Sequence, residues 1–330
     1  MLGARMETMK AIRVARVGGP DMMELVEAPL PRPGPGEALV RVEAAGVNFI
    51  DIYHRTGAYA REPPFGLGED GAGVVASVGP DVHDVRPGDR VAWTSAPGSY
   101  ATHIVARADR LVPVPDGVDT KRAAAAIFQG VTADYLTQST FPVAAGQTCL
   151  VHAGAGGVGL FLVQMARRAG ARVLATTSTD AKAALVRQAG AEHVLIYARE
   201  RFYEAARTLT GGRGVDVVYD SVGAETFEGS LLALRPRGML VLFGQSSGRV
   251  PPLDLQVLNA RGSLYVTRPT IRDYVATRAE LTERAGRVLG AVAKGELTVQ
   301  IHKEYPLARA ADAHRALESR GTSGKVLLVP

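Results

Sequence analysis

The sequence predicts an α/β protein in which a doubly wound parallel sheet follows a β-rich domain. Three observations lead to this fold class. A G-x-G-x-x-G turn at 154–159 joins a short apolar strand to a helix. Strands and helices alternate from there to about residue 243, and short strands punctuated by Gly and Pro fill residues 10–125. A chain of 330 residues also exceeds the usual size of one compact core, so two domains are expected.

The glycine turn is the most informative motif. The stretch 148–159 reads TCLVHAGAGGVG, with Gly154, Gly156 and Gly159 on the required spacing. The first glycine permits a tight turn, the second lets backbone approach a pyrophosphate, and the third lets helix pack on strand. The phosphates would lie at the helix N-terminus, where the helix dipole favours negative charge. The pattern therefore predicts a dinucleotide site, with a plain turn between packed elements as the alternative.

Residues 10–125 have the short, regularly spaced strands that are typical of a partly closed barrel. We expect these strands at 10–14, 38–44, 73–79, 89–93, 100–105 and 111–114. Helix formers dominate 121–126, and 132–139 is also predicted to be helical.

The alternating part begins at the glycine turn. We expect strands at 148–152, 171–176, 193–196, 214–219 and 239–243. The helices between them are predicted at 158–170, 180–189, 201–210 and 225–234. The tail is expected to hold strands at 263–267, 298–301 and 325–329 and a helix at 278–293, and to rejoin the first domain.

Composition excludes several classes of protein. Hydrophobic residues make up 46% and charged residues 22%, as in ordinary globular proteins, and no apolar run is long enough to span a membrane. The first residues lack the apolar core of a signal peptide, so we expect a cytoplasmic protein. Cys149 is the only cysteine, which leaves no disulfide within the chain and no thiolate cluster for zinc. The net charge of +5 is spread along the chain, which disfavours a nucleic-acid partner.

The second strand of the alternating part indicates which dinucleotide binds. NAD sites place a carboxylate about 20 residues past the glycines, on the ribose hydroxyl. Here that strand ends in ATTST at 175–179, and the next acid, Asp180, is expected to cap the following helix. Lys182 adds a cation beside Ser178, so a contact with a 2′-phosphate, and hence NADPH, is predicted. The alternative for Lys182 is an ordinary solvated helix charge.

Several further stretches of the sequence resemble those of a known protein family. They are GVNFIDIY at 46–53, GDRV at 88–91, AGAGGVG at 153–159, YDSVG at 219–223, FGQSSG at 243–248 and GSLYVTRP at 262–269. Together they resemble the NADPH:quinone oxidoreductases, the zinc-free, zeta-crystallin-like branch of the medium-chain dehydrogenase/reductase superfamily. The resemblance implies a GroES-like β-barrel domain made of residues 1–127 and 263–330, a Rossmann NADP-binding domain at 128–262, and a homodimer.

The resemblance also bears on metal. Zinc-dependent relatives carry a Cys near the position of Asn48 and a G-H-E-x-x-G motif. Here that segment reads GEDGAG at 68–73, without the histidine. We therefore expect no metal site, since Glu69 and Asp70 alone do not make one.

The resemblance implies roles for individual positions. Asn48 and Tyr53 match residues at the nicotinamide and substrate end and are the candidate catalytic residues. The predicted cofactor contacts are Gln129, Thr132, Gly154, Gly156, Gly157, Val158, Gly159, Ser178, Lys182, Tyr197, Phe243, Gly244, Gln245, Ser246, Val266, Thr267 and Arg320.

Structural interpretations of the same residues stay open. Asn48 or Asp51 could cap a turn or helix, Tyr53 could only pack, and Arg320 could be a solvated cation. We interpret His54 and His152 as structural, because neither has an acid or nucleophile beside it in the sequence.

The implied activity is hydride transfer from NADPH to a quinone, which needs no strong general acid. One alternative is NADPH-dependent reduction of activated C=C bonds in enones or 2-alkenals. A second is a non-catalytic, crystallin-like NADPH-binding protein that binds RNA.

Overall fold

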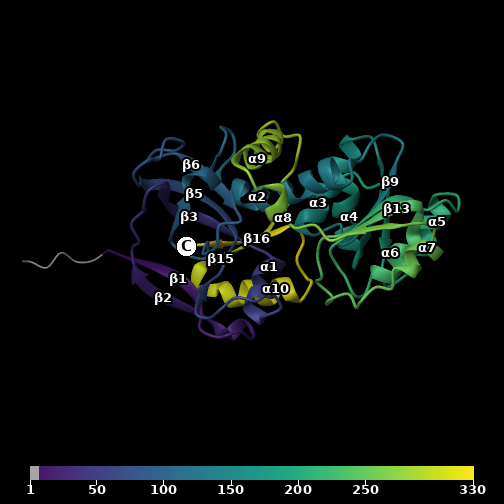
Figure 1. The fold of residues 1–330 in the computed structure, drawn as a ribbon, viewed down its shortest axis with the longest axis horizontal. Coiled ribbons are helices and arrows are strands. Elements are labelled where there is room, and N and C mark those ends of the chain that lie inside the picture. Colours follow the sequence, from purple (N-terminus) through teal and green to yellow (C-terminus); the bar gives the residue numbers. More distant parts are fainter. Residues whose placement is uncertain (1–6) are drawn as a thin grey trace, which may run out of the picture. The chain divides into compact units, whose positions relative to one another are not determined.

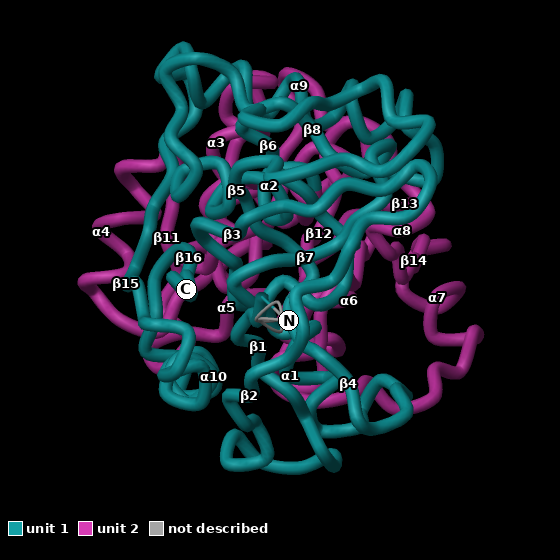
Figure 2. Tube along the Cα trace, turned by 90° about the vertical axis from the view of Figure 1, so that its left-hand side faces the viewer, with its two compact units in different colours: residues 1–131, 275–330 teal, residues 132–274 magenta. Residues whose placement is uncertain are grey.

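The computed structural model describes residues 7–330 and divides into two compact units (Figure 1, Figure 2). Unit 1 runs to residue 131 and resumes from 275 to 330, and unit 2 comprises 132–274. Within the described residues, no helix is long and apolar enough to cross a membrane.

Unit 1 is built on two sheets. The larger has the order β15-β16-β3-β5-β6-β8, and β7 also pairs with β3. Its strands are β3 (Glu37–Val47), β5 (Asp70–Val78), β6 (Arg90–Thr94), β7 (His103–Arg107), β8 (Val112–Pro113), β15 (Ile301–Pro306) and β16 (Lys325–Val329). The smaller sheet has the order β2-β1-β4, with β1 (Thr8–Val14), β2 (Met23–Pro29) and β4 (Phe65–Gly66).

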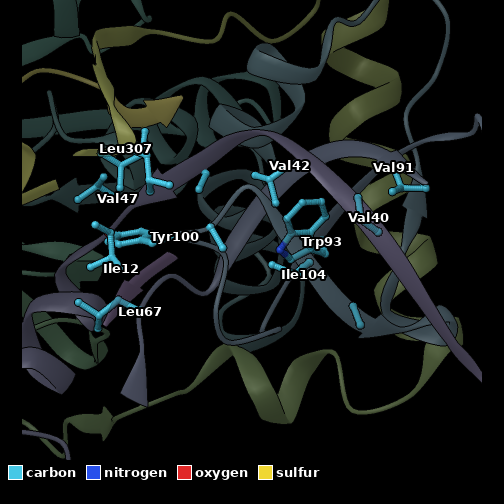
Figure 3. Packing of buried hydrophobic residues seen from close by; sticks show 14 of the residues in the cluster. Ile12, Val40, Val42, Val47, Leu67, Val91, Trp93, Tyr100, Ile104 and Leu307 are labelled. Atoms are coloured by element: carbon cyan, nitrogen blue, oxygen red, sulfur yellow. The ribbon is translucent and has the colours of Figure 1, made fainter. Parts of the chain in front are cut away.

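Alternating apolar side chains of these strands form the core of unit 1. Figure 3 shows Val40, Val42 and Val47 of β3 among the labelled core residues. Trp93 of β6 is fully buried, and its indole N–H donates to Ser99 Oγ at 2.8 Å. The ring is therefore buried with its one polar atom satisfied, as buried tryptophan requires.

Helices frame the sheets of unit 1. They are α1 (Phe49–Thr56), α9 (Arg278–Ala293), α10 (Ala310–Glu318) and the single turns η1 (Pro20–Met22), η2 (Ala108–Arg110) and η4 (Leu307–Arg309). The long helix α2 (Thr120–Tyr135) begins in unit 1 and ends in unit 2. Gly130 on α2 lies against α9, because a Cβ there would come within 2.3 Å of Val288.

Unit 2 holds a six-stranded, fully parallel sheet in the order β11-β10-β9-β12-β13-β14. Its strands are β9 (Thr148–Val151), β10 (Arg172–Thr177), β11 (His193–Ile196), β12 (Val215–Asp220), β13 (Leu234–Leu242) and β14 (Tyr265–Thr267). The chain moves outward from β9 to β11 and then returns to β12 on the other side of β9. Ligands of doubly wound sheets bind at such a switch point, beyond the carboxyl ends of the strands.

Helices connect these strands. They are the π-helical turn η3 (Leu136–Thr140), α3 (Gly157–Arg168), α4 (Asp180–Gln188), α5 (Phe202–Leu209), α6 (Phe227–Ala233), α7 (Gln256–Ala260) and α8 (Ile271–Tyr274). The central strands β9 and β12 are entirely buried, as expected when helices cover a parallel sheet. The predicted α/β class with its doubly wound sheet is confirmed.

Several predicted elements differ from the structure. The two helices expected at 121–126 and 132–139 are one helix, α2, followed by η3. The strand expected at 298–301 is β15, at Ile301–Pro306, and the helix α10 and the strand β2 were not predicted. The strand expected at 263–267 is β14, at Tyr265–Thr267, and it pairs with β13 in the parallel sheet.

Candidate cofactor and active site

The glycine turn follows β9 directly and leads into α3, with Gly156 as the N-cap residue. A Cβ on Gly159 would lie 2.4 Å from the Ala153 carbonyl oxygen, and one on Gly154 would lie 3.0 Å from Ala175. Ala153 itself has a φ of 49°, so the backbone turns sharply there. The turn is therefore a tight cradle of bare backbone at a helix N-terminus, which fits a diphosphate.

The other predicted cofactor positions of unit 2 share the edge of the sheet where this turn lies. Because all six strands are parallel, their carboxyl ends meet at one edge. Ser178 and Lys182 follow β10, Tyr197 follows β11, and the segment 243–246 follows β13. Val266 and Thr267 close β14 at the same edge. Thr132 is buried in α2.

The segment after β13 is tied closely to the segment after β12. The backbone N–H groups of Phe243 and Gly244 donate to the Asp220 carbonyl, at 2.8 and 3.3 Å, and that of Ser246 donates to Ser221. A Cβ on Gly244 would lie 2.5 Å from the Ser221 carbonyl oxygen. The 243–246 backbone is therefore held in one place, while its side chains stay half-buried.

The segment after β10 contains the two charged residues Asp180 and Lys182, and the structure shows how each is placed. Thr179, rather than Asp180, is the N-cap of α4, and its hydroxyl accepts from the Lys182 backbone N–H. Asp180 forms an ion pair with Arg199 at 2.6 Å, which neutralises the one carboxylate of the first turn. Partial burial lowers the pKa of Lys182. The expectation that Asp180 caps the helix was wrong, because the threonine one residue earlier already does so.

A chain of hydrogen bonds lies beneath the glycine turn. His152 Nδ1 lies 2.9 Å from Thr176 Oγ1 and 3.0 Å from the Tyr197 hydroxyl, and its Nε2 lies 3.0 Å from Ser230 Oγ. Ser230 in turn donates to Asp220. Burial lowers the pKa of His152 and raises that of Tyr197 well above its usual value. The Tyr197 hydroxyl thus serves this internal network, and His152 is structural as expected.

In unit 1, Asn48 precedes α1 and forms its N-cap. Its backbone N–H donates to Asp51 Oδ2 at 2.8 Å, which is one half of a capping box. Asp51 therefore helps to cap the helix from its third position, as one of the structural interpretations of the sequence proposed. Asn48 itself is buried.

The three shortest hydrogen bonds of the Asn48 amide join it to partners from different elements. Its Oδ1 accepts from Lys325 Nζ and from Gln129 Nε2, both at 2.8 Å, and its Nδ2 donates to Asp70 Oδ1 at 2.6 Å. Lys325 also pairs with Asp70 at 2.9 Å. The structure thus brings two predicted site residues, Asn48 and Gln129, into direct contact, and it adds a buried ion pair that the sequence did not reveal.

A second buried network meets Asp51. The Tyr100 hydroxyl donates to Asp51 Oδ2 at 3.0 Å and lies 3.1 Å from His314 Nε2. The Arg55 guanidinium lies 3.1 Å from His314 Nδ1, so that nitrogen is the acceptor and Nε2 carries the proton. Burial raises the pKa of Asp51 to about 8, and burial with Arg55 lowers that of His314 to about 3.

Tyr53 lies one turn along α1 from Asn48 and is half-buried. Its ring centroid is 5.1 Å from that of Tyr59 and 6.2 Å from that of Phe49. Arg320 is exposed just beyond α10, with a φ of 56°. Both residues belong to unit 1, like Asn48.

The residues of the segment 68–73, which corresponds to the zinc-dependent relatives' motif, do not fit a zinc site. Asp70 is occupied by Lys325 and Asn48, and an ammonium group beside the carboxylate disfavours a dication there. Glu69 lies 3.6 Å from Arg61 and 3.8 Å from His54. Within residues 7–330, no group of three or more His, Cys, Asp or Glu side chains could hold a metal ion.

Comparison with known proteins gives the same fold. Residues 34–116 match the family of the alcohol dehydrogenase GroES-like domain, which confirms the GroES-like part of the prediction. Residues 157–284 match the zinc-binding dehydrogenase family, although the residues around Asp70 do not form a zinc site.

Similar proteins cover nearly the whole chain. It is 43% identical over 323 residues to a quinone oxidoreductase of Pseudomonas aeruginosa, covering 97% of this chain and 99% of the relative. It is 40% identical over 325 residues to a 2-haloacrylate reductase of a Burkholderia species, covering 96% and 98%. The crystal structure of the Escherichia coli quinone oxidoreductase complexed with NADPH matches with a TM-score of 0.95 at 41% identity, covering 97% of this chain and all of that one.

Proposed function

The chain belongs to the quinone oxidoreductase family of the medium-chain dehydrogenase/reductase superfamily, and on this premise we propose that it transfers a hydride from NADPH to a quinone without a metal ion. The observation that carries the proposal is the pairing of full-length similarity with the bare-backbone turn between β9 and α3. Bound NADPH would supply the hydride, and the protein would supply binding, orientation and exclusion of water.

The chain's own groups suit each part of the cofactor. The first turn of α3 offers backbone N–H groups to the diphosphate. Lys182 offers a cation to a 2′-phosphate, with the nearby Asp180 carboxylate neutralised by Arg199. The ordered backbone of 243–246 is assigned to the carboxamide end.

Reduction of a quinone needs orientation more than acid catalysis, because the product is a stabilised phenolate. We assign Asn48 and Tyr53 to orienting the nicotinamide and the acceptor. The support is their position on one helix start in unit 1, where Asn48 is held by three hydrogen-bond partners.

A steady-state assay tests the proposal. The enzyme is given NADPH or NADH with a panel of benzoquinones and naphthoquinones, in buffer containing EDTA. Rapid quinone-dependent oxidation of NADPH, slower with NADH, is expected. NADPH binding without oxidation by any quinone would contradict it and would favour the non-catalytic alternative.

A second candidate function is reduction of an activated C=C bond. The 2-haloacrylate reductase among the relatives favours it, because that name denotes reduction of a substituted acrylate. Such a reaction must also deliver a proton to carbon, so Tyr53 or a water would matter more. Including 2-alkenals and 2-haloacrylate in the same panel separates the two, since the larger kcat/KM identifies the preferred acceptor class.

We further propose a cytoplasmic homodimer. The absence of any possible disulfide within the chain suits a reducing compartment. Strand β14 ends the parallel sheet in unit 2, and its Tyr265 is 57% exposed, so this edge is suited to pairing with a second copy.

A further inference from the structure

The amide of Asn48 has only one chemically allowed orientation. Lys325 Nζ can only donate, and an ionised Asp70 carboxylate can only accept. Turning the amide over would place its NH₂ group against the ammonium and its oxygen against the carboxylate. Gln129 could offer either end of its own amide, and the Gly46 carbonyl and Asp51 Oδ2 lie farther from Asn48 Nδ2, at 3.4 and 3.5 Å. Lys325 at 2.8 Å and Asp70 at 2.6 Å are therefore the main groups that set the orientation.

The ion pair that sets this orientation is completely buried. Lys325 and Asp70 are 2% and 0% exposed, and the ammonium lies 5.7 Å from the Phe128 ring centroid. Burying such a pair costs much of the energy that its attraction returns, so a gain in stability is a poor explanation for it. A better explanation is that the pair specifies one geometry for a neighbouring group.

The absence of a side chain at Gly46 leaves room for the Lys325–Asp70 pair. Strand β16 pairs antiparallel with β3, and Leu327 lies opposite Gly46. A Cβ on Gly46 would lie 2.3 Å from Lys325 Nζ and 2.4 Å from Asp70 Oδ2. Only a residue without a side chain at position 46 lets the ammonium and the carboxylate meet beside Asn48.

We propose that the buried Lys325–Asp70 pair is a positioning pair, which fixes the Asn48 amide for hydride transfer. Asp70 itself belongs to the segment 68–73, which corresponds to the G-H-E-x-x-G motif of zinc-dependent relatives. This inference rests on the proposed quinone reductase function. Neither residue touches substrate; both act through Asn48.

A double-mutant cycle tests this role. The variant Lys325→Met/Asp70→Asn removes both charges together, so no unpaired charge stays buried. We expect kcat with NADPH and a benzoquinone to fall about tenfold, because a misplaced group costs that much or more. The NADPH Kd should stay within about twofold. Adding Asn48→Ala should then cause no further loss, whereas Asn48→Ala alone should match the double variant.

Two other variants complete the design. Gly46→Ala keeps both charges but separates them sterically, and it should reproduce the loss in kcat. Asp216→Asn is the control: it removes a buried carboxylate that pairs with the partly exposed Arg213 and Arg235 in unit 2, and kcat should stay near the wild-type value.

The outcomes separate the inference from the function on which it rests. Wild-type kcat in Lys325→Met/Asp70→Asn would overturn the positioning role. So would a combined variant with Asn48→Ala in which the fold-losses of kcat multiply, because the pair would then act independently of Asn48. A wild-type enzyme without quinone activity would overturn the proposed function alone. The orientation is then decided by a crystal structure of Lys325→Met/Asp70→Asn at atomic resolution, which distinguishes the amide nitrogen from the oxygen, and an unchanged Asn48 amide would refute the inference.

Discussion

Two lysines show how the same side chain serves different tasks in this protein. Lys325 is fully buried and paired with Asp70 on a strand of unit 1. Lys182 is half-buried on the first turn of α4, next to a carboxylate that Arg199 already neutralises. The first is suited to holding a neighbour in place, and the second to meeting an anion from solution.

Lys182→Ala should abolish the preference for NADPH. Loss of the cation removes its attraction to a 2′-phosphate, so kcat/KM for NADPH should fall about tenfold, or about 1.4 kcal/mol, while that for NADH stays unchanged. Steady-state kinetics with both cofactors measures this. Lys294→Ala, which removes an exposed lysine after α9, is the matched control. Equal losses with both cofactors would contradict the phosphate assignment.

Asp51 makes the stability of unit 1 dependent on pH. Its pKa is raised from 3.8 to about 8, chiefly by burial and then by Asp70 and Glu69. Between these values the unfolded chain releases the proton that the folded chain keeps, so stability should fall as pH rises from about 4 to about 8. Asp51→Asn cannot titrate and should flatten this fall, by at most about 1.4 kcal/mol per pH unit.

Urea unfolding followed by the fluorescence of Trp93 measures this effect, because the only tryptophan lies in the core of unit 1. The difference in unfolding free energy between wild type and Asp51→Asn is compared at pH 5, 6, 7 and 8. A difference that does not change with pH would contradict a neutral Asp51 in the folded protein.

At the level of elements, the turn between β9 and α3 is tightly constrained. Gly159→Ala would place a Cβ 2.4 Å from the Ala153 carbonyl oxygen, so the turn must open and NADPH binding should weaken at least tenfold. Gly290→Ala in α9 meets no atom within 4 Å and should be neutral or stabilise by up to about 1 kcal/mol. Fluorescence titration with NADPH and thermal unfolding compare the two variants. Wild-type affinity in Gly159→Ala would refute the assignment of this turn.

Local patterns predicted many of the elements. Strands β11 and β16 and helix α9 lie where alternation and periodicity placed them, at His193–Ile196, Lys325–Val329 and Arg278–Ala293. Helix α10 was missed because its short apolar stripe, interrupted by charges, is a weak periodic signal. Asp180 was mistaken for a cap because Thr179 and Asp180 are both good N-cap residues.

The site was only partly predictable. The glycine turn and Asn48 carry recognisable local patterns, whereas Lys325 meets Asn48 across 277 positions of sequence. No spacing rule joins β16 to the start of α1, since the contact depends on the antiparallel pairing of β16 with β3. Tyr100 and His314 were missed for the same reason: each is an ordinary residue in its own element.

At the scale of the whole molecule, the edge strand β14 is the expected dimer contact. Tyr265→Lys would place a charge on an exposed position of this edge, which should block strand pairing and yield monomers. Size-exclusion chromatography with light scattering measures the mass, for which one chain is 34.8 kDa. Lys303→Ala on β15 of unit 1 is a control that should leave the mass unchanged. A Tyr265→Lys protein of unchanged dimeric mass would locate the contact elsewhere.

The most direct test of the central claim is a crystal structure of the protein soaked with NADPH. We expect density for the diphosphate within hydrogen-bond distance, about 3 Å, of the backbone N–H groups at the start of α3, beside the glycines of 154–159. The 2′-phosphate should lie next to Lys182. Diphosphate density at any other place would contradict the account.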